Sequence, residues 1–103
     1  MRANRTDANQ TEIIKFFEQA GCSVVNISSL KNRCDLVVSK NLITVFVEVK
    51  DGSKPPSQRQ LTKGEEIFRG TTKGAWFLIE SIEDAQRLVE WLNSAQLKAR
   101  GSW

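Results

Sequence analysis

The sequence predicts a single α/β domain with the element order α-β-β-β-α-β-α, in which helices flank a central mixed four-stranded sheet. Two patterns predict this fold. Three segments place apolar residues at helical spacing, and four short runs rich in Val, Ile and Phe are typical of strands. A chain of 103 residues has the usual size of one domain. Residues 1–103 are therefore expected to form one unit, with 96–103 as a frayed polar tail.

The first helix is predicted to begin after Asp7, a favourable N-cap with Gln10 at the capping-box position, and to end at Gly21. Its apolar stripe consists of Ile13, Phe16, Phe17 and Ala20. Glu12 falls at the margin of this stripe. A Glu in such a position is usually a surface residue. The alternative is that Glu12 reaches a polar site at the junction between helix and sheet.

Three strands are predicted next, over residues 22–28, 36–39 and 44–50. Consecutive strands joined by short polar loops favour antiparallel pairing. In the third strand the period of two places the alternating valines on one face and Glu48 and Lys50 together on the other. Glu48 and Lys50 are therefore neighbours if this segment is a strand.

The segment after the third strand is predicted to be irregular, because residues 51–57 contain Gly and a double Pro. The helix that follows has two possible starts, since capping boxes begin at both Ser57 and Thr62. Gly70 is expected to end this helix.

An apolar run at residues 75–79 predicts the fourth strand. A strand without polar residues is typical of a central position, or of one covered on both faces. Because a helix precedes it, this strand should pair in parallel with the third strand. Ser81 is predicted to cap the last helix, with Asp84 at the capping-box position.

Composition limits the chemistry that the chain can perform. The formal net charge of +3 permits a polyanionic partner without requiring one. The absence of histidine excludes a His base, a His metal ligand and a Ser/His or Cys/His nucleophile pair. Two cysteines, Cys22 and Cys34, lack zinc-site spacing and are read as buried free thiols in a reducing cytoplasm. The N-terminal residues lack the apolar core of a signal peptide, and no run is long enough for a membrane span, so no membrane partner is expected.

Three charged residues should meet at one end of the sheet. Antiparallel pairing of the second and third strands brings Asp35, at the start of one, beside Glu48 and Lys50, at the end of the other. Mg²⁺ prefers such oxygen ligands, and it can polarise a phosphate and lower the pKa of a bound water. A lysine could stabilise developing negative charge, or act on the nucleophile if its pKa is depressed. The alternative is a surface ion pair of little energetic value.

The same residues resemble the bipartite signature of the PD-(D/E)xK nuclease superfamily, with Cys34-Asp35 before a hairpin and Glu48-Val49-Lys50 after it. The continuation over residues 47–57, ending in Pro-Pro-Ser, is similar to small phage-type proteins of the VRR-NUC branch. The opening at residues 7–13 is similar to the first helix of that branch. The resemblance covers roughly residues 2–85 and implies a restriction-endonuclease-like core. Cys34 stands where the superfamily name has Pro, a position that shapes the turn.

The resemblance implies a role for each site residue. Asp35 and Glu48 would be metal ligands together with the backbone carbonyl of Val49, and Lys50 would be the catalytic lysine. Glu12 would approach the metal directly or through water. A Gln on the helix after the motif often completes such sites. Gln60 is the best candidate by position, and Gln58 and Glu65 compete with it because the start of that helix is not fixed.

The function implied by the resemblance is a Mg²⁺- or Mn²⁺-dependent endodeoxyribonuclease without an organic cofactor. It would prefer branched DNA such as Holliday junctions or flaps, and would act as a homodimer in the cytoplasm of a bacterial or phage-infected cell. Trp76, Trp91 or the hairpin at residues 39–41 could supply the dimer surface. Two alternatives are a catalytically silent nucleic-acid binder and a small interaction module in which the charges are ion pairs. The residues expected to bind nucleic acid are Lys31, Arg33, Lys54, Ser57, Arg59 and Lys63.

Overall fold

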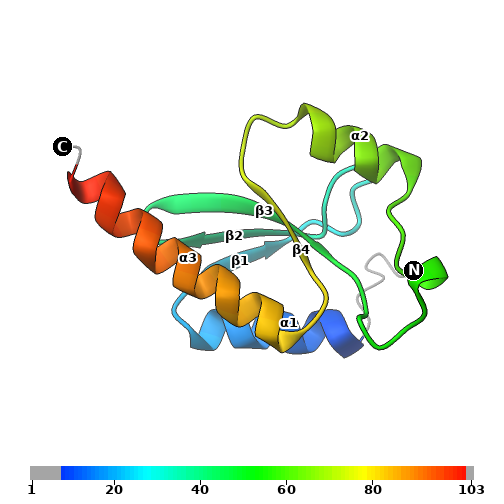
Figure 1. Cartoon of the computed structure of the whole chain (residues 1–103), viewed down its shortest axis with the longest axis horizontal. Helices are drawn as coiled ribbons and strands as arrows, with labels where there is room; N and C mark the ends of the chain where they lie inside the picture. The colour runs from blue at the N-terminus through cyan, green and yellow to red at the C-terminus, as the bar shows by residue number, and fades with distance from the viewer. Residues whose placement is uncertain (1–7, 102–103) are drawn as a thin grey trace.

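A computed structural model of the chain describes the backbone of residues 8–101 and the side chains of residues 9–95. The helices are α1 (Ala8–Gln19), α2 (Lys63–Thr71) and α3 (Ile82–Gly101), with one 3-10 turn, η1 (Pro56–Gln58). The strands are β1 (Ser23–Asn26), β2 (Leu36–Lys40), β3 (Ile43–Val49) and β4 (Trp76–Ile79). The predicted element order is confirmed (Figure 1).

The four strands form one mixed sheet in the order β1-β2-β3-β4. β1, β2 and β3 make an antiparallel meander, and β4 lies parallel to β3, as predicted. The prediction of a central position for the fourth strand is wrong, and the alternative of cover on both faces is met in part, by Trp91 against Phe77 and by Arg69 over Trp76. β4 is an edge strand, and its Leu78 is 37% exposed. Its apolar residues instead pack against neighbouring helices, for example Phe77 against Trp91 of α3.

Helix ends follow local chemistry that is readable in the sequence. Gly21 ends α1 in a left-handed conformation (φ +90°), with hydrogen bonds from Gly21 to Glu18 and from Cys22 to Phe17 that define a Schellman motif. Ser81 caps α3 by accepting a hydrogen bond from the Asp84 amide at 3.1 Å. The Asp84 carboxylate accepts from the Glu80 amide, one residue before the expected partner.

Two predicted boundaries differ from the structure, and one lies outside it. α2 continues to Thr71, past Gly70, where the helix ends without a left-handed glycine. α3 is helical to Gly101, so residues 96–101 are helical where a frayed tail was expected. The predicted Asp7 cap and residues 102–103 lie outside the described residues.

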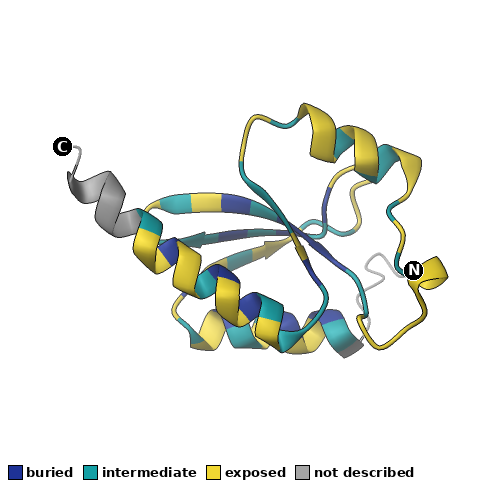
Figure 2. Cartoon of the chain, viewed as in Figure 1, coloured by how far each residue is buried: buried dark blue, intermediate teal, exposed yellow. Residues whose placement is uncertain are grey.

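The core lies on one face of the sheet, called here the closed face, which carries Val45, Val47 and Val49 of β3. α1 and α3 lie side by side on it and contact one another (Figure 1). Dark, buried segments accordingly run along the strands and the inner sides of these two helices (Figure 2). Other fully buried side chains of this core are Ile13, Phe17, Leu36, Val38, Ala85 and Leu92.

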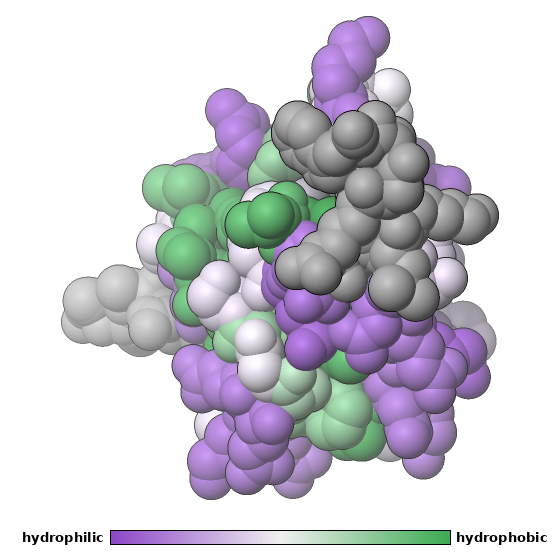
Figure 3. Space-filling model, turned by 90° about the vertical axis from the view of Figure 1, so that its left-hand side faces the viewer, coloured by the Kyte–Doolittle hydropathy of each residue, from purple (hydrophilic) through white to green (hydrophobic). Residues whose placement is uncertain are grey.

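The opposite face, called here the open face, has only partial cover. α2 lies over it, every residue of α2 is at least partly exposed, and the Phe68 ring packs edge-on against Phe46 at 5.2 Å between centroids. Viewed from the end where β2 turns into β3, exposed hydrophobic side chains lie among hydrophilic ones (Figure 3). One apolar row crosses the open face in register, formed by Val25, Val37, Phe46 and Trp76. The next positions along the strands carry the predicted site.

Candidate active site

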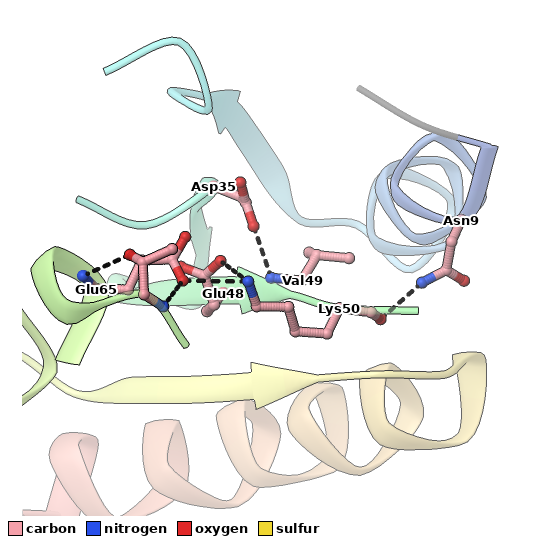
Figure 4. A network of polar contacts seen from close by, with 7 residues as sticks. Asn9, Asp35, Glu48, Val49, Lys50 and Glu65 are labelled. Carbon is pink, nitrogen blue, oxygen red and sulfur yellow. Dashed lines mark hydrogen bonds and ion pairs between the residues drawn. The ribbon is translucent and has the colours of Figure 1, made fainter. Parts of the chain in front are cut away.

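The pairing of β2 with β3 brings Asp35 to the end of β3, as the sequence predicts. The Asp35 amide donates to the Val47 carbonyl at 3.0 Å, which extends the ladder by one residue. The Asp35 carboxylate in turn accepts a hydrogen bond from the Val49 amide at 2.8 Å (Figure 4). The N–H and C=O of one strand residue point towards the same neighbouring strand. The Val49 carbonyl is therefore directed to the side of Asp35.

Glu48 is the most deeply buried charged residue in the described part of the chain, with 2% exposure. Burial raises the pKa of Glu48 to about 9, helped by the charge and hydrogen bond of Asp35 and by the charge of Glu65, and opposed by Lys50. Without a cation, Glu48 is therefore held as the neutral acid at pH 7. Ionisation of a carboxyl group is unfavourable in such a buried position. A bound divalent cation stabilises the ionised form and offsets that cost.

Lys50 lies between two carboxylates on the open face. Its ammonium group is 3.7 Å from Glu48 Oε2 and 3.1 Å from Glu65 Oε1 (Figure 4). Burial alone would lower the pKa of Lys50. The hydrogen bond and charge of Glu65, together with the charges of Glu48 and Asp35, outweigh burial and raise the pKa above its usual value. Lys50 is thus positively charged at neutral pH, which suits charge stabilisation better than proton abstraction.

Glu65 reaches the site because α2 starts at the later of the two predicted positions. Thr62 is the N-cap, and both hydrogen bonds of its capping box are present. Glu65 Oε1 accepts from the Thr62 amide at 2.9 Å and from the Lys50 ammonium at 3.1 Å. The other candidate start, at Ser57, lies in the 3-10 turn Pro56–Gln58.

α1 contributes Gln10, which sequence reasoning assigned only to a capping box. Asn9 Nδ2 donates to the Lys50 carbonyl at 2.8 Å and ties the start of α1 to the end of β3 (Figure 4). Gln10 is 5% exposed and lines the same cavity as Asp35 and Glu48. The signal was available, because Gln10 precedes Ile13 by three residues and so shares its inward-facing stripe.

The site cavity has a volume of about 250 Å³ and is lined almost entirely by polar groups. Of the three residues proposed to complete the site, Gln58 and Glu65 line it. Gln60 is exposed and lines a different cavity, beside Trp76. The residues of the site cavity are Gln10, Asp35, Glu48, Val49, Lys50, Asp51, Lys54, Gln58 and Glu65.

Glu12 is exposed and lines a neighbouring cavity instead, with Gly52, Arg59 and Glu80. The two cavities share only Asp51 among the residues that line them. The structure therefore does not bring Glu12 together with Asp35 and Glu48. Its position matches the surface alternative considered for this residue.

The predicted nucleic-acid contacts fall into three groups. Lys54 lines the site cavity, and Ser57 precedes the lining residue Gln58 in the 3-10 turn. Arg59 is held by the Lys54 carbonyl and by an ion pair with Glu80 at 3.1 Å, so it braces the loop. The remaining exposed residues of the group are Lys31, Arg33 and Lys63.

The cysteines do not contribute to the site chemistry. Both carry buried free thiols. Burial raises the pKa of Cys34 to about 11, and its thiol donates to the Leu36 carbonyl at 3.3 Å. A thiol held in this way stays neutral and is a poor nucleophile or metal ligand. Cys34 thus acts as a buried packing residue at the turn into β2.

The donor set fits a hard divalent cation. Among the described residues, no three His, Cys, Asp or Glu side chains are arranged as a metal cluster. The oxygen donors are two carboxylates and a strand carbonyl, with amide side chains nearby. Mg²⁺ typically takes one or two carboxylates and completes its shell with waters and phosphate oxygens. This set suits Mg²⁺ or Mn²⁺ rather than Zn²⁺.

Comparisons with protein-family models, curated proteins and solved structures found no match for this chain. The resemblance to the PD-(D/E)xK superfamily therefore stays an interpretation of the motif residues. No helix in the described part of the chain is long and apolar enough to cross a membrane.

Proposed function

We propose that this protein is a Mg²⁺- or Mn²⁺-dependent endonuclease that hydrolyses DNA phosphodiester bonds. The observation that carries the proposal is the burial of Glu48 next to Asp35 and Lys50 in one polar cavity. An ordinary surface ion pair leaves both partners in water and gains little. Burying a carboxylate beside another one costs stability, which a cation can restore. The cavity is therefore better explained as a cation site than as an ion pair.

In this proposal Asp35, Glu48 and the Val49 carbonyl hold the metal ion. When bound, the ion would polarise the phosphate and lower the pKa of a coordinated water. Lys50 neutralises the negative charge that develops on the phosphate oxygens. Lys54, from the loop that lines the same cavity, adds a second positive charge for the nucleic-acid backbone.

Selectivity for branched DNA and a homodimeric state belong to the same proposal and rest on the motif resemblance. The three predicted dimer surfaces differ in how far their apolar side chains are exposed. Trp91 is 43% exposed with its ring against Phe77, and Trp76 is partly buried. The hairpin turns at Asn41 and Leu42, and Leu42 is 98% exposed. The buried free thiols agree with the reducing cytoplasm of a bacterial or phage-infected cell.

The test offers labelled four-way junction, flap, linear duplex and single-stranded DNA to the wild type and to Lys50→Ala, with Mg²⁺ and then Mn²⁺. Loss of the ammonium group should slow cleavage at least about 100-fold. Lys15→Ala removes an exposed lysine from α1 and should cut like the wild type.

Equal cutting by the wild type and Lys50→Ala, or no cutting by either, would overturn the proposed activity. Metal-independent DNA binding that survives Asp35→Ala would favour the silent binder. No salt-dependent DNA affinity at all would favour the interaction module.

A further inference from the structure

A second cavity lies on the open face, between β4 and α2, and has no role in the chemistry above. Its volume is about 700 Å³. It is separate from the site cavity, because the two cavities share no lining residue. The residues that line it are Gln60, Leu61, Glu66, Arg69, Trp76 and Leu78.

The walls of this cavity suit a flat aromatic ligand. The Arg69 guanidinium lies over the Trp76 indole at 5.4 Å from the ring centroid. Leu61 and Leu78 supply apolar surface beside them, and Leu78 is 37% exposed. Indole and guanidinium planes are the groups on which nucleobases stack in proteins that bind single strands.

The polar groups of the cavity argue against a phosphate and for a base. Glu66 balances the charge of Arg69, so the cavity offers no excess positive charge to an anion. The Glu66 carboxylate can accept hydrogen bonds from exocyclic amino groups. The Gln60 amide can both donate and accept. Together they can pair with the edge of a neutral heterocycle.

The sheet register places this cavity directly beside the site cavity. Leu78 pairs with Glu48, and Trp76 pairs with Phe46, so both project on the open face. Adjacent strands are about 4.8 Å apart. A nucleotide with its phosphate at Glu48 and Lys50 could therefore place its base, or the next one, against Trp76.

We propose that the cavity at Trp76 and Arg69 binds an unpaired nucleobase of the nucleic acid whose phosphate occupies the site. This inference rests on the proposed function and specifies its substrate class. The preferred strand has at least one unstacked nucleotide beside the phosphate, as in a single strand, a flap or a branch point. An intact duplex keeps its bases stacked and cannot fill the cavity without paying for extrusion.

The binding test compares a fluorescently labelled single-stranded oligonucleotide with the duplex of the same sequence, at fixed salt and without divalent metal. Trp76→Ala should bind the single strand about tenfold more weakly, since base–aromatic stacking is lost. Duplex affinity should change little. Trp76→Phe keeps a ring and should retain most of the affinity. Val25→Ala is the control, because Val25 is an exposed apolar residue in the same row of the open face and lines neither cavity.

A second readout is independent of cleavage and of the Ala variant's folding. Oligonucleotide binding should quench tryptophan fluorescence in Trp91→Phe and lose most of that quenching in Trp76→Phe. Equal single-strand affinity for Trp76→Ala and Val25→Ala, with equal quenching in the two Phe variants, overturns the base site.

The two proposals fail separately. Cleavage that depends on Lys50, without a Trp76 effect on single-strand affinity or on quenching, overturns the base site and leaves the nuclease standing. Single-strand binding that depends on Trp76, without Lys50-dependent cleavage, overturns the nuclease and supports the cavity as a base site.

Discussion

The two faces of the sheet are built from alternate residues of the same strands and have opposite properties. On the closed face, Val45, Val47 and Val49 are buried beneath α1 and α3. On the open face, the residues between them are Phe46 and Glu48, beneath the loosely attached α2. A single seven-residue strand thus supplies both the core and the site. The strand period allows the protein to bury an ionisable side chain on one face without disturbing the apolar packing on the other.

The largest expected effect on stability comes from replacing one leucine on each face with alanine and comparing the two losses. Leu92→Ala removes a fully buried side chain of α3 from the core of the closed face. It should lower the free energy of unfolding by roughly 2–5 kcal/mol. Leu78→Ala, on the open face, should cost less than about 1 kcal/mol because its side chain is already 37% exposed. Urea denaturation of both variants measures the difference, and equal losses would show that the faces are not distinct.

The second prediction concerns the buried carboxyl group of Glu48 on the open face. The pKa of Glu48 is raised to about 9 in the folded protein, so the fold binds a proton that the unfolded chain releases above its ordinary pKa. The free energy of unfolding should therefore fall as pH rises from about 5 to about 9 in the absence of metal. Glu48→Gln should flatten this decline and stabilise the metal-free protein by roughly 1–3 kcal/mol near pH 8.

Addition of Mg²⁺ should further distinguish the wild type from Glu48→Gln. It should raise the melting temperature of the wild type at pH 8 and have little effect on Glu48→Gln, because the metal binds the ionised form of Glu48. Thermal melts at pH 5, 7 and 9, with and without Mg²⁺, measure both effects. A wild type whose stability rises from pH 5 to pH 9 without metal would contradict the buried-carboxyl account.

A smaller effect is expected where α2 attaches to the open face. Phe68→Ala removes the edge-on contact with Phe46 and should cost about 1 kcal/mol in global stability. The free energy of local opening of α2 should fall by more than the free energy of global unfolding, since this contact joins the helix to the sheet. Hydrogen exchange should quicken in α2 and stay slow in α3. Uniform quickening in both helices would mean that α2 is part of the core unit.

The smallest effect on stability is expected at the tip of the hairpin between β2 and β3. Asn41 and Leu42 both have positive φ, at 56° and 71°. Two central residues of this kind are typical of a type I′ turn, which favours glycine at the second position. Leu42→Gly should stabilise the protein by roughly 0.5–1 kcal/mol, because the left-handed strain exceeds the added chain entropy. An unchanged or lower denaturation midpoint would contradict this expectation.

Much of the site could be predicted because strand chemistry is periodic. If residues 44–50 form a strand, Glu48 and Lys50 must share a face, and antiparallel pairing with the preceding strand brings Asp35 to them. The structure confirms this geometry, with the Asp35 carboxylate 2.8 Å from the Val49 amide. The chemistry assigned to it stays a prediction.

Other parts of the site depend on long-range packing that no local pattern records. The start of α2 was ambiguous between two capping boxes. Once the later one is used, Glu65 rather than Gln60 faces Lys50. β4 looked central because its residues are apolar, yet apolar composition does not distinguish a buried strand from an edge strand covered by Arg69 and Trp91.

One carboxylate oxygen of Glu65 serves two donors, the Thr62 amide and the Lys50 ammonium. In the proposed nuclease, Lys50 would leave Glu65 for a phosphate of the substrate, and the Glu65 oxygen would keep its hydrogen bond from the Thr62 amide. Lys50 would then change its anionic partner without loss of the α2 cap. The first turn of α2 would hold the Lys50 ammonium group between substrate-binding events.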